Sequence, residues 1–214
     1  AQLRSLLTKS VPISDIELKI WLLAIFCLLK ILNIYLFGFW LILHNLDIKR
    51  ETLPSTKLKF GFFIFAFIFF IFEVILEFVM FAAIDIDKMV SCCGTLYSSS
   101  ASSSVSTIFQ IQTPLLLSGF YICFLFIVLF FFLKRAYLFA LANALFLFLA
   151  IVSLISFFGT YIYELPTHHC PFCFLQKDYY YVGYAIYTTL FIGTFNGLAT
   201  GFIDRFKTSL IFNI

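Results

Sequence analysis

Long apolar segments alternate with short polar connections along this 214-residue chain. A helix needs about 20 apolar residues to cross the hydrocarbon of a bilayer, so a segment of that length predicts a membrane-spanning helix. Five segments are long enough, at residues 20–43, 60–84, 108–133, 137–163 and 179–203. The pattern therefore predicts an all-α polytopic membrane protein. Pro114 lies inside the third segment and predicts a kink there.

The composition agrees with this prediction. Hydrophobic residues make up 63% of the chain and charged residues 12%, which is roughly half the charged share of a soluble domain. The 32 phenylalanines are too many for one small soluble core, so most of them face lipid. The sequence has no phosphate-binding loop, no nucleophile–histidine–aspartate arrangement and no nucleic-acid motif. We therefore expect the lipid bilayer, and no nucleic acid, as a partner.

Lysine and arginine gather in alternate connections. They follow the first segment (Lys49, Arg50, Lys57, Lys59), the third (Lys134, Arg135) and the fifth (Arg205, Lys207). Connections rich in these residues stay on the cytoplasmic side of a membrane. The bias therefore predicts a multi-pass protein of a cytoplasmic (inner) membrane, with residues 85–107 and 164–178 on the non-cytoplasmic face.

The first segment is less simple, because Lys30 and Asn33 interrupt it near its middle. Either it spans the membrane and Lys30 faces a protein neighbour, or it lies in the interface as an amphipathic helix. Its uninterrupted apolar length favours spanning. We therefore expect an N-terminal part, residues 1–56, with one additional hydrophobic helix that is available to partners in a membrane complex. Residues 57–214 are expected to form a four-helix transmembrane bundle.

Four of the six cysteines lie in the two non-cytoplasmic connections, as the adjacent pair Cys92 and Cys93 and as the Cys-x-x-Cys pair Cys170 and Cys173. Disulfide chemistry is permitted on that face of the membrane. A Cys-x-x-Cys pair serves in both redox and metal sites. A structural disulfide is a third interpretation.

We expect the Cys-x-x-Cys pair to open the last helix. Pro171 suits an early helical position, where its missing N–H costs no hydrogen bond. The N-terminus of that helix, together with Lys177, would favour the reactive thiolate form of the cysteines.

The sequence Cys-Pro-Phe-Cys-Phe-Leu-Gln-Lys at residues 170–177 resembles the Cys-x-x-Cys-aromatic-x-Gln-basic signature of DsbB-type disulfide-generating membrane proteins. The order of parts is similar to that of the vitamin K epoxide reductase branch. There a loop cysteine pair comes first, two helices follow, and the Cys-x-x-Cys begins the last helix of a four-helix bundle. The resemblance covers about residues 57–205. It implies a thiol–disulfide oxidoreductase that passes electrons from a thioredoxin-fold thiol protein to a quinone.

The resemblance also implies residue roles. Cys170 and Cys173 are the pair next to the quinone, and Lys177 is the basic residue near its head group, although the usual residue is arginine. Cys92 and Cys93 are the shuttle pair that accepts electrons from the thiol partner. Shuttle cysteines of the family are separated along the loop, whereas these two are adjacent. A disulfide between neighbours closes a small strained ring, which favours either rapid exchange or a metal-binding role instead.

Two histidines precede the Cys-x-x-Cys pair and match no step of the resemblance. Histidine titrates near neutral pH and ligates metals readily. We assign His168 to proton transfer and His169 to cofactor binding; the alternative is that both are solvated loop residues. A second interpretation is a copper or zinc site in a metal-binding membrane protein or in a subunit of a larger transport or respiratory complex. Its candidate ligands are His168, His169, Cys92, Cys93, Cys170 and Cys173.

Two carboxylates interrupt the second segment. Glu73 and Glu77 are one helical turn apart and share a face of the helix. Carboxylates inside a bilayer are costly, and they usually face the bundle interior and handle protons or ions. They form either a proton relay or a structural hydrogen-bonding group with Tyr, Ser or Lys30.

Other residues within the segments indicate packing. Cys27 and Cys123 lie in mid-segment and are expected to act as small apolar residues. Gly193, Gly197 and Gly201 recur every four residues in the fifth segment. Such a stripe of small residues predicts close contact with a neighbouring helix.

Overall fold

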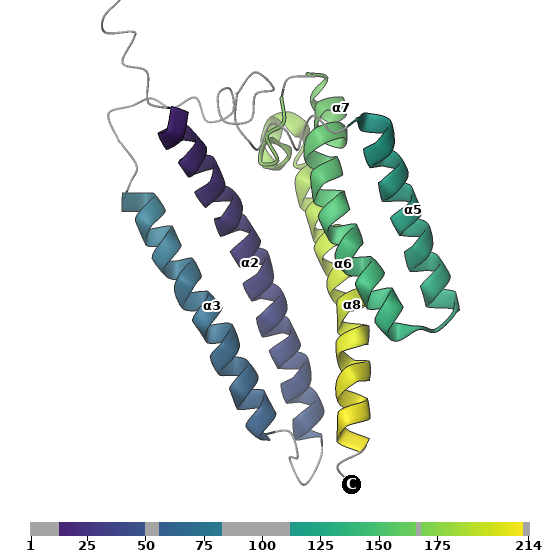
Figure 1. Cartoon of the computed structure of the whole chain (residues 1–214). Coiled ribbons are helices and arrows are strands. Elements are labelled where there is room, and N and C mark those ends of the chain that lie inside the picture. The colour runs from purple at the N-terminus through teal and green to yellow at the C-terminus, as the bar shows by residue number, and fades with distance from the viewer. Residues whose placement is uncertain (1–12, 50–55, 83–111, 166–167, 212–214) are drawn as a thin grey trace, which may run out of the picture.

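The computed structural model describes residues 13–49, 56–82, 112–165 and 168–211 (Figure 1). Every element in this part of the chain is helical. The five long helices are α2 (Ile13–Ile48), α3 (Thr56–Ala82), α5 (Thr113–Phe132), α6 (Ala136–Ser153) and α8 (Val182–Ile211). Each includes a stretch long and apolar enough to cross a membrane. The prediction of an all-α polytopic membrane protein is confirmed, and the first segment has the length and composition of a spanning helix.

The fourth span is not one regular helix. After α6 the chain passes through a π-helical turn, Leu154–Phe158, and a short helix α7, Gly159–Tyr163. Together they make a continuous apolar span over Ala136–Tyr163. A π turn shifts the backbone hydrogen bonds of a helix and often occurs at functional sites. This one lies on the side of the cysteine-bearing connection.

Pro114 does not kink a helix, so that prediction is wrong. Helix α5 begins at Thr113, which places Pro114 in its first turn. A proline there breaks no intrahelical hydrogen bond, because the first N–H groups of a helix have no partner within it.

The helices form two packed groups. Helix α6 packs against both α5 and α8, and α3 packs against α2 (Figure 1). Helix α2 also contacts α8 and so joins the two groups. Successive helices run in opposite directions, so Ile48, Thr56, Phe132 and Ala136 lie at one end of the molecule. Ala82, Thr113, Tyr163 and Val182 lie at the other end.

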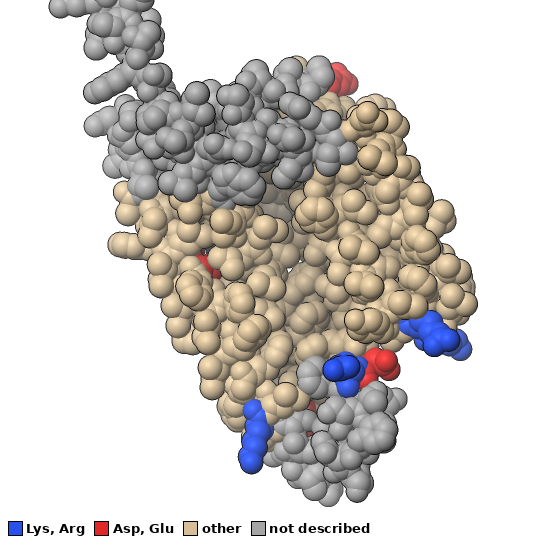
Figure 2. All heavy atoms as spheres, in the orientation of Figure 1, with Lys and Arg blue, Asp and Glu red and all other residues tan. Residues whose placement is uncertain are grey.

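Basic side chains mark the first of these ends. Figure 2 shows Lys and Arg atoms along the lower edge of the molecule and, above them, a flank with almost no charged atoms. A further lysine at this end, Lys59, is buried and pairs with Asp47, with 2.9 Å between Nζ and Oδ2. The pair closes the α2–α3 hairpin.

Glycines bring α6 and α8 together. A Cβ atom on Gly197 would overlap the side chain of Asn143, and one on Gly201 would overlap Ala140. Gly193 has nothing within 4 Å of such an atom. The predicted close packing is therefore found at two of the three glycines.

The glycine contacts give a matched pair of substitutions. Gly201→Ala is expected to destabilise the protein by about 1–3 kcal/mol, because the added methyl group meets the Ala140 Cβ atom, which cannot rotate away, and so forces α6 and α8 apart. Gly193→Ala, on the same helix with open space around it, serves as the control. The melting temperature of each purified variant in one detergent is the measurement. Equal melting temperatures for the two variants would contradict the packing described here.

Candidate cysteine–histidine site

The Cys-x-x-Cys pair lies in the connection between α7 and α8, not at the start of α8. Two short 3₁₀ turns, Cys173–Leu175 and Lys177–Tyr179, separate it from Val182, where α8 begins. Tyr180 and Tyr181 have φ angles of 51° and 56°. These left-handed conformations interrupt helical geometry. The prediction that the pair opens the last helix is therefore wrong.

Three donor atoms meet in this connection. A ring nitrogen of His168 and the Sγ atoms of Cys170 and Cys173 all lie within 4.8 Å of one another. His168 Nε2 is 3.2 Å from Cys173 Sγ. The two cysteines are only 2% and 4% exposed. The structure thus brings together three of the six predicted donors, and it shields both sulfurs from solvent.

Tyr163, the last residue of α7, holds the connection in place. Its hydroxyl donates to the Cys170 carbonyl at 2.6 Å and accepts from the Phe174 amide at 3.1 Å. Its ring stacks on Phe174 with 4.7 Å between the centroids, and it meets His168 edge-on at 4.8 Å. One side chain therefore fixes the backbone on both sides of the motif and the position of the histidine.

Tyr187, on α8, provides a second anchor, because its hydroxyl donates to the Pro171 carbonyl at 2.6 Å. Sequence reasoning missed both tyrosines. In a chain with 11 tyrosines, those near membrane boundaries are expected simply as an interfacial belt. The sequence feature that could have indicated an anchoring role for Tyr163 is its position at the end of a span, a few residues before the Cys-x-x-Cys pair.

His169 faces a different way from His168. It is buried, and its Nδ1 lies 3.1 Å from the carbonyl oxygen of Ile155 in the π turn. It is not one of the three grouped donors. The two adjacent histidines thus have different contacts. His168 lies beside the sulfur of Cys173, and His169 joins the connection to the fourth span through the Ile155 carbonyl.

The remaining predicted site residues lie elsewhere. Lys177 is exposed at the start of the second 3₁₀ turn. Cys92 and Cys93 fall outside the described residues. Cys123 is buried with its Sγ 3.5 Å from the Ala142 carbonyl, as expected of a packing residue, and Cys27 is partly buried in α2.

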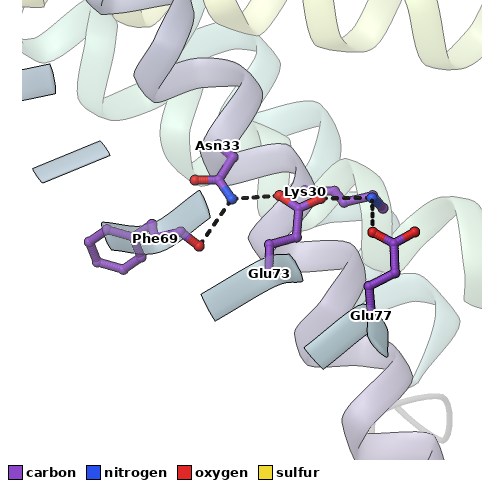
Figure 3. Close-up of polar contacts among 5 residues, drawn as sticks. All are labelled: Lys30, Asn33, Phe69, Glu73 and Glu77. Carbon is purple, nitrogen blue, oxygen red and sulfur yellow. Dashed lines mark hydrogen bonds and ion pairs between the residues drawn. The ribbon is translucent and has the colours of Figure 1, made fainter. Parts of the chain in front are cut away.

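Glu73 and Glu77 pair with α2 (Figure 3). Lys30 Nζ is 2.7 Å from Glu73 Oε1 and 3.5 Å from Glu77 Oε2. Lys30 thus faces a protein neighbour, donating a hydrogen bond to Glu73 and forming an ion pair with Glu77. These contacts join α2 to α3 and do not involve the connection between α7 and α8.

An apolar cavity of about 690 Å³ lies between α5, α6 and α8. Its lining includes Phe124, Phe146 and Leu190, with polar groups from Asn143 and Thr189. Ala185 and Ile186 also line it and lie just before Tyr187, the anchor of the cysteine connection. The cavity therefore lies along α8 from Ala185, near the end of the helix closest to the cysteines, to Thr194.

No family model, curated protein or solved structure matches this chain. The function is accordingly argued from the chemistry of the site.

Proposed function

We propose that this protein is a membrane thiol–disulfide oxidoreductase in which Cys170 and Cys173 form the redox pair and a quinone is the electron acceptor. The observation that carries the proposal is the grouping of the two sulfurs and a His168 nitrogen within 4.8 Å. To form a disulfide the two sulfurs approach from this spacing to about 2.05 Å. The location at the end of a span gives a lipid-soluble acceptor access from the bilayer.

The central step balances as a two-electron oxidation. The S–H bonds of Cys170 and Cys173 break, and one S–S bond forms between them. The two electrons and two protons pass to the quinone, which becomes a quinol. His168, 3.2 Å from Cys173 Sγ, accepts the thiol proton and so generates the thiolate, the nucleophilic form of cysteine.

The hydrocarbon tail of the acceptor in this proposal occupies the apolar cavity between α5, α6 and α8. No described residue of the cysteine connection lines this cavity, so the head group extends from it toward that connection. Lys177 is the proposed basic group near the quinone head group, as the resemblance to the DsbB-type proteins implies.

Because both sulfurs are buried, the proposal includes a second cysteine pair of the same chain that carries electrons to them. A soluble thiol protein cannot contact side chains that are 2% and 4% exposed. In the proposed route a thioredoxin-fold protein reduces Cys92 and Cys93, which then exchange with the buried pair. We place these events on the non-cytoplasmic face of a cytoplasmic (inner) membrane, because the basic residues gather at the opposite end of the helices.

The proposal is tested with the purified full chain in lipid nanodiscs, supplied with a small dithiol and a short-chain quinone. We expect quinol to form at a rate proportional to the protein concentration. Quinol formation no faster than with empty nanodiscs would overturn the proposal.

His168 gives a prediction for the same assay. Because His168→Gln removes the proton acceptor beside Cys173, the turnover rate is expected to fall about 100-fold or more. His44→Gln is the matched control, since His44 lies near the end of α2 where the basic residues gather. An unchanged rate in His168→Gln would remove the histidine from the mechanism.

The same three donors favour a second candidate function, metal binding. Two thiolates and an imidazole are the ligand types that zinc and copper(I) select. A stably bound metal would hold the two sulfurs apart and exclude the disulfide. Elemental analysis of the purified protein distinguishes the two functions. One zinc or copper per chain, lost in Cys170→Ser and kept in Cys123→Ser, together with no quinol formation, would establish the metal site instead.

A further inference from the structure

A polar cluster lies within the membrane-spanning part of α2 and α3. It consists of Lys30 and Asn33 from α2 and Glu73 and Glu77 from α3 (Figure 3). Glu73 and Glu77 lie nine and five residues before Ala82, the end of α3, at depths of about 13 and about 7 Å along the helix. The cluster therefore lies in the half of the span nearer the cysteine-bearing end, and the buried Glu73 has to be satisfied without bulk water.

The two carboxylates are held differently. Glu73 receives Lys30 Nζ at 2.7 Å on one oxygen and Asn33 Nδ2 at 2.5 Å on the other. It is buried, and both of its oxygens accept from donors, as the charged form requires. Glu77 has one longer contact, 3.5 Å to Lys30, and its side chain is 40% exposed. Glu73 is therefore the ionised partner of Lys30, and Glu77 is the carboxyl group left over.

Asn33 points to a further ligand in the cluster. Its Nδ2 donates to Glu73 and to the Phe69 carbonyl at 3.3 Å. Both of these partners are acceptors, which fixes the orientation of the amide. Its Oδ1 is buried and has no hydrogen-bond partner among the described residues. Buried acceptors of this kind are normally satisfied by a donor, often water.

A cavity lies beside the cluster. It has a volume of about 350 Å³, and its polar lining comes from Lys30, Asn33 and Glu73. Phe37 and Phe70 form much of the rest. A space with polar side chains in its lining can hold water, which would exchange protons with the cluster.

From this geometry we propose that the cluster is a proton-binding site and that the proton binds at Glu77. Two carboxylates face one ammonium, so the cluster carries one negative charge unless one proton is bound. Net charge is unfavourable within a bilayer, and binding one proton makes the cluster neutral. Among the described residues of the two helices, Lys30 lies against Glu77 and Glu73 lies one turn away from it, and Cys27 lies one turn before Lys30. The proposal does not depend on the redox chemistry of Cys170 and Cys173.

Infrared spectroscopy of the purified full chain in lipid nanodiscs tests the proposal, because a protonated carboxyl group has its own C=O band, which shifts in deuterium oxide. At neutral pH the wild type is expected to show one such group in a dry environment. Glu77→Gln should lose it, because Lys30 and Glu73 then balance. Glu164→Gln, an exposed carboxylate beyond α7, is the control and should keep it.

Charge counting supplies a sharper second test. Lys30→Met leaves two carboxylates without a cation, so the band should double. In Lys30→Met combined with Glu73→Gln, Glu77 is the one carboxyl group left in the cluster, so the band should return to the intensity of one protonated group. This double variant is the control for a loss of folding in Lys30→Met. A band that persists in Glu77→Gln would overturn the proposal. So would no band in the wild type, a result that would favour a basic side chain from a partner helix as the neutralising group.

Discussion

Replacing Cys173 with serine is expected to reduce dithiol-dependent quinol formation to the uncatalysed rate. Serine has nearly the same shape as cysteine, so the connection anchored by Tyr163 and Tyr187 should keep its structure. Without the second sulfur, however, the Cys170–Cys173 disulfide cannot form, and the two-electron step cannot be completed. The measurement is the rate of quinol formation in nanodiscs.

Cys123→Ser is the matched control for this substitution. Cys123 is buried as well, but it lies on α5 against the Ala142 carbonyl. Its variant should retain the wild-type rate. Substantial turnover in Cys173→Ser, at a rate within a factor of ten of the wild type, would show that the Cys-x-x-Cys pair is not the redox centre.

Removing the cation of the buried ion pair between α2 and α3 is expected to cause the largest loss of stability. Lys59→Met leaves the carboxylate of Asp47 without its ammonium partner, and that side chain has no exposed surface. Breaking a buried pair from one side costs about 3–5 kcal/mol, because the remaining buried charge loses an opposite charge. The free energy of unfolding in a mixed detergent–denaturant series measures this loss.

Two variants control for this result. Lys57→Met removes an exposed lysine one half-turn away and should change stability by no more than about 0.5 kcal/mol. Lys59→Met combined with Asp47→Leu removes both charges and should recover most of the loss, because apolar residues often replace a buried pair without cost. Equal losses in Lys57→Met and Lys59→Met would show that burial of the pair is unimportant.

The spanning helices were predictable from the sequence because their signal is length and hydrophobicity alone. A helix that faces lipid needs a continuous apolar surface. Only the first segment allowed two interpretations, a spanning helix or an interfacial one, because Lys30 and Asn33 lie inside it. The structure explains those two residues by contacts with Glu73, a partner about 40 residues away. Contacts between residues this far apart in the chain cannot be recognised from sequence periodicity. The length of the apolar segment was therefore the sequence feature that favoured a spanning helix over an interfacial one.

The local geometry of the site was less accessible to prediction. The residues Cys-Pro-Phe-Cys are compatible with the first turn of a helix, and the left-handed conformations of Tyr180 and Tyr181 that separate them from α8 have no clear sequence signal. His168 and His169 are chemically identical neighbours, and only the path of the chain decides which of them lies beside Cys173. Asp47 likewise became recognisable only through its contact with Lys59.

The central claim is that Cys170 and Cys173 exchange electrons as a pair, and its most direct test is a single-turnover reaction. The fully reduced Cys92→Ser, Cys93→Ser variant, in which the shuttle pair cannot re-reduce the buried pair, receives one equivalent of quinone without oxygen. The free thiols are then alkylated under denaturing conditions and located by mass spectrometry. The account predicts that Cys170 and Cys173 lose their alkylation together while one quinol forms per chain. Full alkylation of both cysteines beside unreacted quinone would contradict it.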